Sequence, residues 1–112
     1  MFGLFKTKKL YFLYDFPGFG ERVVTLRHTP SKQLQQRMKA TGVGTVLING
    51  ERIDVYPDIH TPTRIWIKAQ EEKMGIELQG DALVRAVESI STFSNPVPMD
   101  LLLALSDPQE IT

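Results

Sequence analysis

Cysteine is absent from this sequence. Its absence excludes disulfide bonds, thiolate metal ligands and a cysteine nucleophile, and it suits a reducing compartment. Long apolar stretches are also missing, because no run approaches the roughly 20 residues that a membrane-spanning helix needs. At the N-terminus the apolar residues precede the lysines, which is the reverse of the order in a secretory signal. We therefore expect a cytoplasmic protein.

Net charge is lacking as well, but the charges are unevenly spread. The 13 lysines and arginines balance the 13 aspartates and glutamates. Residues 1–39 hold eight of the basic residues and two acids, whereas residues 40–112 hold five basic residues and eleven acids. Seven of the ten aromatic residues lie within residues 1–19. If the two halves keep separate faces after folding, the molecule has a basic side and an acidic side; if folding interleaves them, the asymmetry cancels locally.

What the sequence does contain is the composition of one globular domain. Its 112 residues are 42% hydrophobic and 23% charged, which is ordinary for a folded domain of this size. We assign residues 1–112 to a single domain, with residues 1–8 as a candidate flexible arm and residues 107–112 as a frayed tail.

Two strands and a helix are predicted in the first part of the chain. Residues 9–16 are rich in β-forming residues, and residues 22–28 follow as a second strand after a proline- and glycine-containing break. Thr29, before a proline, is typical of a helix start. The helix should run to about Thr41, with Gly42 ending it.

A β-hairpin is the clearest local prediction. Residues 43–48 and 51–56 flank Asn49-Gly50, a dipeptide that adopts the positive φ angles of a type I′ turn. The two-residue loop sets the register, which pairs Val46 with Ile53 and Thr45 with Asp54.

The second half is predicted to hold two more strands and two helices. Apolar and polar residues alternate over residues 64–69 and 76–79, which favours strands, with a helix over 62–73 as the alternative. Asp81 can cap a helix over residues 82–93, and residues 99–105 form a short last helix. The class is α+β: a mostly antiparallel sheet with two to three helices packed on one face.

No motif in the sequence indicates catalysis, a metal or a cofactor. Gly18-Phe19-Gly20 fits a plain turn better than a phosphate-binding loop, because it follows a proline and precedes a strand. His28 and His60 would need a third ligand such as Asp54 or Asp58 to hold a metal. Serines that could pair with a histidine lack a nucleophile elbow. We predict a protein that is not an enzyme and that uses neither metal nor cofactor.

Self-association is the first functional hypothesis. The basic, aromatic N-terminal part and the acidic remainder are complementary, so copies could meet head to tail. The N-terminal lysines Lys6, Lys8 and Lys9 could also contact a membrane surface or nucleic-acid phosphates, but an arm docked on a neighbouring subunit uses the apolar residues as well. By analogy, such an assembly or adaptor subunit fits a phage particle or another mobile element. The expected interface anchors are Phe2, Phe5, Leu102 and Leu105.

Nucleic-acid binding is the alternative hypothesis. The predicted helix over 29–41 shows a wide polar and basic face, and a strand over 64–69 would place the only tryptophan between two cations as a stacking platform. Zero net charge weighs against a dedicated nucleic-acid binder. The residues expected to carry this function are Lys32, Arg37, Lys39, Arg64, Trp66 and Lys68.

Overall fold

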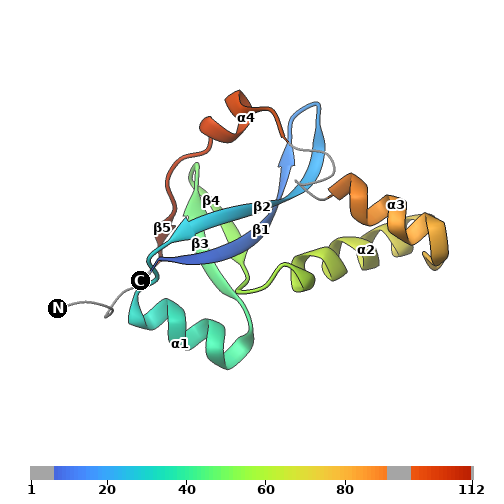
Figure 1. Cartoon of the computed structure of the whole chain (residues 1–112). Coiled ribbons are helices and arrows are strands. Elements are labelled where there is room, and N and C mark those ends of the chain that lie inside the picture. Colours follow the sequence, from blue (N-terminus) through green and yellow to red (C-terminus); the bar gives the residue numbers. More distant parts are fainter. Residues whose placement is uncertain (1–6, 91–96, 112) are drawn as a thin grey trace.

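The computed structural model describes residues 7–90 and 97–111 and has an α+β fold (Figure 1). It contains two antiparallel sheets, one of two strands and one of three, together with helices α1 to α4. The predicted fold class is therefore confirmed.

The first sheet is a hairpin of β1 (Lys8–Phe16) and β2 (Gly20–His28), as the alternation of β-forming residues predicted. Leu10, Phe12 and Phe16 lie on one face of β1 and are 1–2% exposed. Their neighbours along the strand point the other way, as they must in extended backbone. The hairpin thus contributes one wall of the core.

The second sheet has the strand order β4-β3-β5. Strands β3 (Gly44–Ile48) and β4 (Glu51–Val55) form the predicted hairpin, with φ of 54° at Asn49 and 78° at Gly50. The predicted register is confirmed, because Val46 pairs with Ile53 and Thr45 with Asp54.

Strand β5 (Gln109–Glu110) adds a third strand to this sheet. It lies within the segment that we expected to fray, and it pairs antiparallel with β3. The two sheets meet where Tyr11 and Tyr56 exchange two backbone hydrogen bonds of 2.8 Å. Phe12, Val46 and Val55 are buried between them in one apolar core.

Helix α1 (Lys32–Thr41) packs on β3 through Leu34 and Met38. Its N-cap is Ser31 and not Thr29, because the Ser31 hydroxyl accepts a hydrogen bond from the backbone N–H of Leu34 at 3.2 Å. The helix ends at Gly42, which has a φ of 81°, as predicted.

Residues 60–74 form a helix, α2 (His60–Met74), and the predicted strands over 64–69 and 76–79 are wrong. A hydrogen bond to the first turn explains why a helix forms here and not the predicted strands. The Asp58 carboxylate accepts hydrogen bonds from the backbone N–H of Thr61 at 2.7 Å and from its hydroxyl at 3.0 Å, which satisfies a free donor of the first turn. Gly75, with a φ of 68°, ends the helix.

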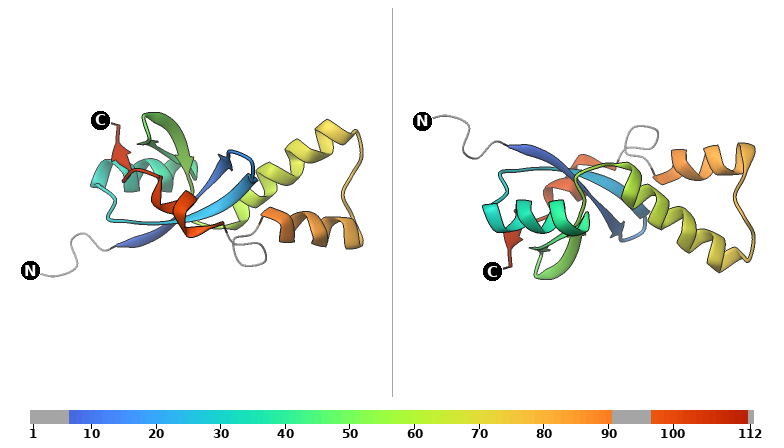
Figure 2. Two further views of the ribbon diagram at one scale, coloured as in Figure 1. Left: turned by 90° about the horizontal axis from the view of Figure 1, so that it is seen from above. Right: turned by 90° about the horizontal axis from the view of Figure 1, so that it is seen from below.

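Helix α3 (Gly80–Ile90) runs back toward the sheets at an angle to α2 (Figure 2), and α4 (Met99–Leu103) is shorter than the predicted 99–105. Asp81 lies inside the first turn of α3 instead of preceding it. The predicted end of α3 at residue 93 lies outside the described residues.

Helices α2 and α3 form a hairpin that we call the helical arm (residues 60–90), which projects from the sheets (Figures 1 and 2). At its base, α2 contacts β1 and α3 contacts β2. The arm stretches the molecule to 49 Å in its longest dimension, against 33 and 24 Å in the others. The tip of the arm and α1 lie at opposite ends of that long axis (Figure 2).

Candidate functional sites

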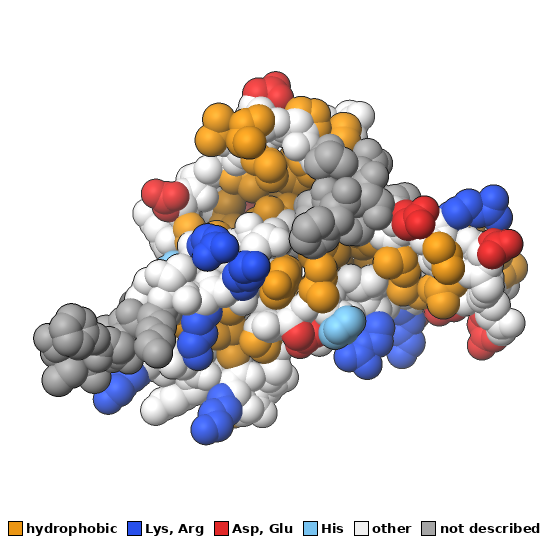
Figure 3. Space-filling model, viewed as in Figure 1, with side chains coloured by type: hydrophobic (Ala, Val, Ile, Leu, Met, Phe, Trp, Pro, Cys, Tyr) orange, Lys and Arg blue, Asp and Glu red, His pale blue; other side chains and the backbone are white. Residues whose placement is uncertain are grey.

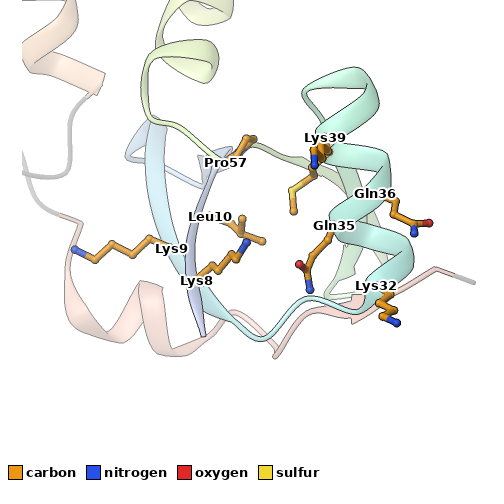
Figure 4. Close-up of a pocket in the computed structure, with 9 residues that line it drawn as sticks. Lys8, Lys9, Leu10, Lys32, Gln35, Gln36, Lys39 and Pro57 are labelled. Carbon is orange, nitrogen blue, oxygen red and sulfur yellow. The ribbon is translucent and has the colours of Figure 1, made fainter. Parts of the chain in front are cut away.

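A hollow of about 670 Å³ lies between α1 and the first residues of β1, and we call it the lysine groove (Figure 4). Its floor is apolar, because Leu10 and Met38 are almost fully buried there. Its rim carries four lysines, two from the strand and two from the helix. The full lining is Lys8, Lys9, Leu10, Lys32, Gln35, Gln36, Met38, Lys39 and Pro57.

The lysine groove has positive charge and no acid among the described residues that line it. None of its four lysines has a carboxylate within ion-pair distance in residues 7–90 and 97–111. Lys8 and Gln35 extend toward one another across the hollow, whereas Lys9 extends to the other side of β1 (Figure 4). Like charges gathered on a concave surface raise the local potential and attract anions.

Only two of the three basic residues predicted on α1 share this groove. Lys32 and Lys39 line it, but Arg37 lines a separate hollow of about 430 Å³ on another side of α1, together with Glu110. Lys8 and Lys9 take the place of Arg37 in the groove. From the sequence we placed Lys8 at the end of a candidate arm and Lys9 at the start of the first strand, and we joined neither to the helix, because only the folded chain brings β1 and α1 together.

Arg64, Trp66 and Lys68 do not form the expected stacking platform. On a helix, residues four apart share a face and residues two apart do not. Arg64 and Lys68 accordingly line one shallow hollow of α2, which does not include Trp66. The indole is half-buried, and it does not lie between the two cations.

The helical arm exposes large apolar side chains that its own packing leaves uncovered. Ile65 is 45% exposed and Val84 is 54% exposed, and near the tip Met74 and Ile76 are 51% and 56% exposed. Figure 3 shows apolar side chains gathered over the arm, with charged groups around them. A shallow hollow of about 480 Å³ beside Ile65 has Ile67 and the stems of Arg64 and Lys68 in its lining.

The predicted interface anchors fall into two groups. Phe2 and Phe5 lie outside the described residues. Leu102 and Leu105 are half-buried and pack against the core of their own chain. The exposed apolar side chains of α4 are instead Met99, at 67%, and Leu103, at 76%.

A polar cluster that the sequence analysis missed ties the end of the chain to β2 and α1. Glu110 accepts a hydrogen bond at 2.8 Å from the imidazole Nε2 of His28, one at 3.0 Å from the backbone N–H of Ser31, and one from the Ser31 hydroxyl. Burial raises the pKa of Glu110, but these hydrogen bonds outweigh it and leave the pKa below its ordinary value. His28 is thus engaged by Glu110, while His60 begins α2.

Comparisons with known proteins give no family for this chain. No protein-family model matches it, and searches of curated proteins and of solved structures found no match either. Among the described residues there is no group of three histidines, aspartates or glutamates placed to hold a metal ion. No helix in the described part of the chain is long and apolar enough to span a membrane.

Proposed function

We propose that this protein is a non-enzymatic assembly subunit that self-associates through its helical arm. The observation that carries the proposal is the set of exposed apolar side chains on the arm, namely Ile65, Met74, Ile76 and Val84. Apolar side chains gather over the arm (Figure 3), and apolar surface that a folded domain leaves exposed is typical of a protein-binding face.

The shape of the arm supports a second copy as the partner. Two helices can cover only one side of each other, so a projecting helical hairpin leaves apolar side chains uncovered. Two such hairpins packed together make a four-helix bundle, which covers them. A twofold axis would place the same surface of each copy against the other, which is the commonest arrangement in soluble homo-oligomers.

Charge on the arm also favours pairing between arms over the head-to-tail contact expected from the sequence. The arm carries four basic residues and five acids, so it is nearly neutral and does not repel a second copy. The acids of the second half are therefore not concentrated on the arm as a counterpart of the lysine groove. The basic residues of the arm are Arg64, Lys68, Lys73 and Arg85, and its acids are Glu71, Glu72, Glu77, Asp81 and Glu88.

We expect association to be moderate in strength. Burying a half-exposed aliphatic side chain contributes on the order of 1 kcal/mol. Four such side chains in each of two copies give roughly 8 kcal/mol, and the entropic cost of association offsets part of this gain. Self-association should therefore be weak, with a dissociation constant in the micromolar range or above.

Sedimentation velocity over about 5 to 200 µM tests the proposal, with concentration-dependent dimerisation as the expected result. Ile65→Glu and Val84→Glu should each weaken the dimer by about tenfold or more, because a carboxylate would have to be desolvated at the contact. Both positions are about half exposed, so the variants are expected to fold like the wild type by circular dichroism.

Leu103→Glu is the matched control, because it adds the same charge to an exposed apolar position of α4. It should leave the dimer unchanged. A wild type that stays monomeric up to 200 µM would end the proposal, and so would equal weakening by the α4 variant and the two arm variants.

A further inference from the structure

The lysine groove is an unexplained feature of this fold. Self-association through the arm does not use it, since α1 and the tip of the arm lie at opposite ends of the molecule (Figure 2). Four lysines line it, Lys8 and Lys9 from β1 and Lys32 and Lys39 from α1, although the Lys9 side chain extends to the other side of β1 (Figure 4). In the described chain, the lysines of this hollow have no neutralising carboxylate.

The chemistry of the lining fits a chain of phosphates. A lysine is a flexible point charge with three donors, which suits phosphate oxygens that need not be held in one fixed geometry. Gln35 extends into the hollow (Figure 4) and presents a side-chain amide that can donate to and accept from sugars or base edges. This amide is already oriented, because its nitrogen donates to the carbonyl of Pro30 at 3.0 Å.

We propose that the lysine groove binds the phosphate backbone of single-stranded nucleic acid. A flexible single strand can place its phosphates along this open hollow of about 670 Å³, whereas a stiff duplex cannot follow its surface. No aromatic side chain is among the described residues that line the groove, so stacking contributes nothing there and sequence preference should be slight. The half-buried Trp66 is not part of this site.

The test is fluorescence polarisation with a fluorescein-labelled oligothymidine of about 15 nucleotides, a length within the site sizes of single-strand binders. If Lys8, Lys32 and Lys39 contact phosphates, the logarithm of the association constant should fall with the logarithm of salt concentration with a slope of about −2. Substitution of Lys8, Lys32 or Lys39 by alanine should make this slope shallower by about 0.7 each, whereas Lys9→Ala should change it less, because the Lys9 side chain extends to the other side of β1 (Figure 4).

Matched controls distinguish binding in the groove from attraction to the total positive charge of the protein. Lys68→Ala and Lys73→Ala remove the same charge from exposed positions of α2 and should leave both affinity and slope unchanged. Lys39→Arg keeps the charge and should keep the slope. If the α2 variants lose as much affinity as the groove variants, binding follows net charge and the groove has no special role.

Competition experiments address the ligand class. Unlabelled oligothymidine should displace the probe at least tenfold more effectively than a duplex of equal length or poly-glutamate of equal charge. Displacement by poly-glutamate at the same concentration would identify an acidic protein segment as the ligand and overturn the proposal. The groove variants should still dimerise, and Ile65→Glu should still bind the probe. Either proposal can therefore be contradicted without affecting the other.

Discussion

At the scale of single residues, Glu110 shows how one side chain can anchor the end of a chain. Its carboxylate is bonded to His28 at the end of β2 and to Ser31 at the start of α1, while its backbone pairs with β3. Both Glu110 and His28 are about one-fifth exposed, so water competes only partly for these bonds. The cluster joins three elements that are distant in sequence.

Replacing the charge of this carboxylate tests its role in stability. Glu110→Gln keeps the size of the side chain but removes the charged acceptor, and hydrogen bonds to charged groups contribute about 1.5 to 3 kcal/mol each at most. Discounting for partial exposure, we expect a loss of about 1 to 2 kcal/mol in the free energy of unfolding, measured in urea. Glu51→Gln, at an exposed position of β4, should change it by less than about 0.5 kcal/mol. Equal losses of unfolding free energy in the two variants would show that the hydrogen bonds of Glu110 contribute nothing to stability.

The same carboxylate predicts how stability depends on pH. The pKa of Glu110 is lowered in the folded state, so its contribution is present above the unfolded pKa and is lost as pH falls through the folded one. Wild-type stability should therefore fall as pH drops below about 5. Urea titrations at several pH values should show a shallower decline for Glu110→Gln. If the unfolding free energy of Glu110→Gln declined with falling pH as steeply as that of the wild type, other groups would be responsible for the loss of stability in acid.

At the scale of elements, the contact between α1 and β3 depends on a residue without a side chain. A Cβ built at Gly44 would lie 2.4 Å from Cδ1 of Leu34 and 3.1 Å from Cγ of Met38, both of which are buried. This requirement could not be predicted from the sequence, because the residues that approach Gly44 come from a preceding helix. Glycine here lets the helix lie close to the strand.

Substitutions at Gly44 and Leu34 test whether close packing of α1 on β3 needs a glycine at position 44. Gly44→Ala is expected to cost about 1 to 3 kcal/mol of unfolding free energy, because Leu34 must leave its position in the core. Leu34→Ala alone opens a cavity, but combined with Gly44→Ala it also removes the clashing atom. The double variant should thus lose less stability than the sum of the two single losses, by at least about 0.5 kcal/mol in urea unfolding. If the double variant lost as much unfolding free energy as the two single variants together, this would contradict the contact between Leu34 and position 44.

Elements fixed by local chemistry were the ones that the sequence predicted. Asn49-Gly50 sets the hairpin and its register without help from the rest of the chain, and Gly42 ends α1 in the same way. Alternation of Ile65, Ile67 and Ala69 fits a strand, but the capping by Asp58 favours the helix that formed. The signal for this helix was present in the sequence, in Asp58 just before its start at His60 and in Gly75 at its end.

Sites that depend on the whole molecule could be predicted only in part. The basic face of α1 was visible from its polar residues, but Lys8 and Lys9 join it only because β1 lies beside α1 in the folded chain. Strand β5 is a pairing across the length of the chain, and a two-residue strand leaves no periodicity in the sequence. The exposed apolar residues of the arm followed from neither composition nor charge, since they depend on which faces of α2 and α3 meet.

The two proposals make a joint prediction at the scale of the whole molecule. If arms pair, each dimer carries two lysine grooves at its far ends, and a strand long enough to reach both gains affinity from effective concentration. Oligothymidine of about 60 nucleotides should therefore bind the wild type at least tenfold more tightly than one of about 15 nucleotides, beyond the gain from having more sites per strand. Ile65→Glu should remove this excess for the long strand and leave binding of the short strand unchanged, as measured by fluorescence polarisation at fixed salt. The Leu103→Glu control should keep the excess. An excess that survives in the Ile65→Glu variant would mean that the grooves are brought together by something other than the arm.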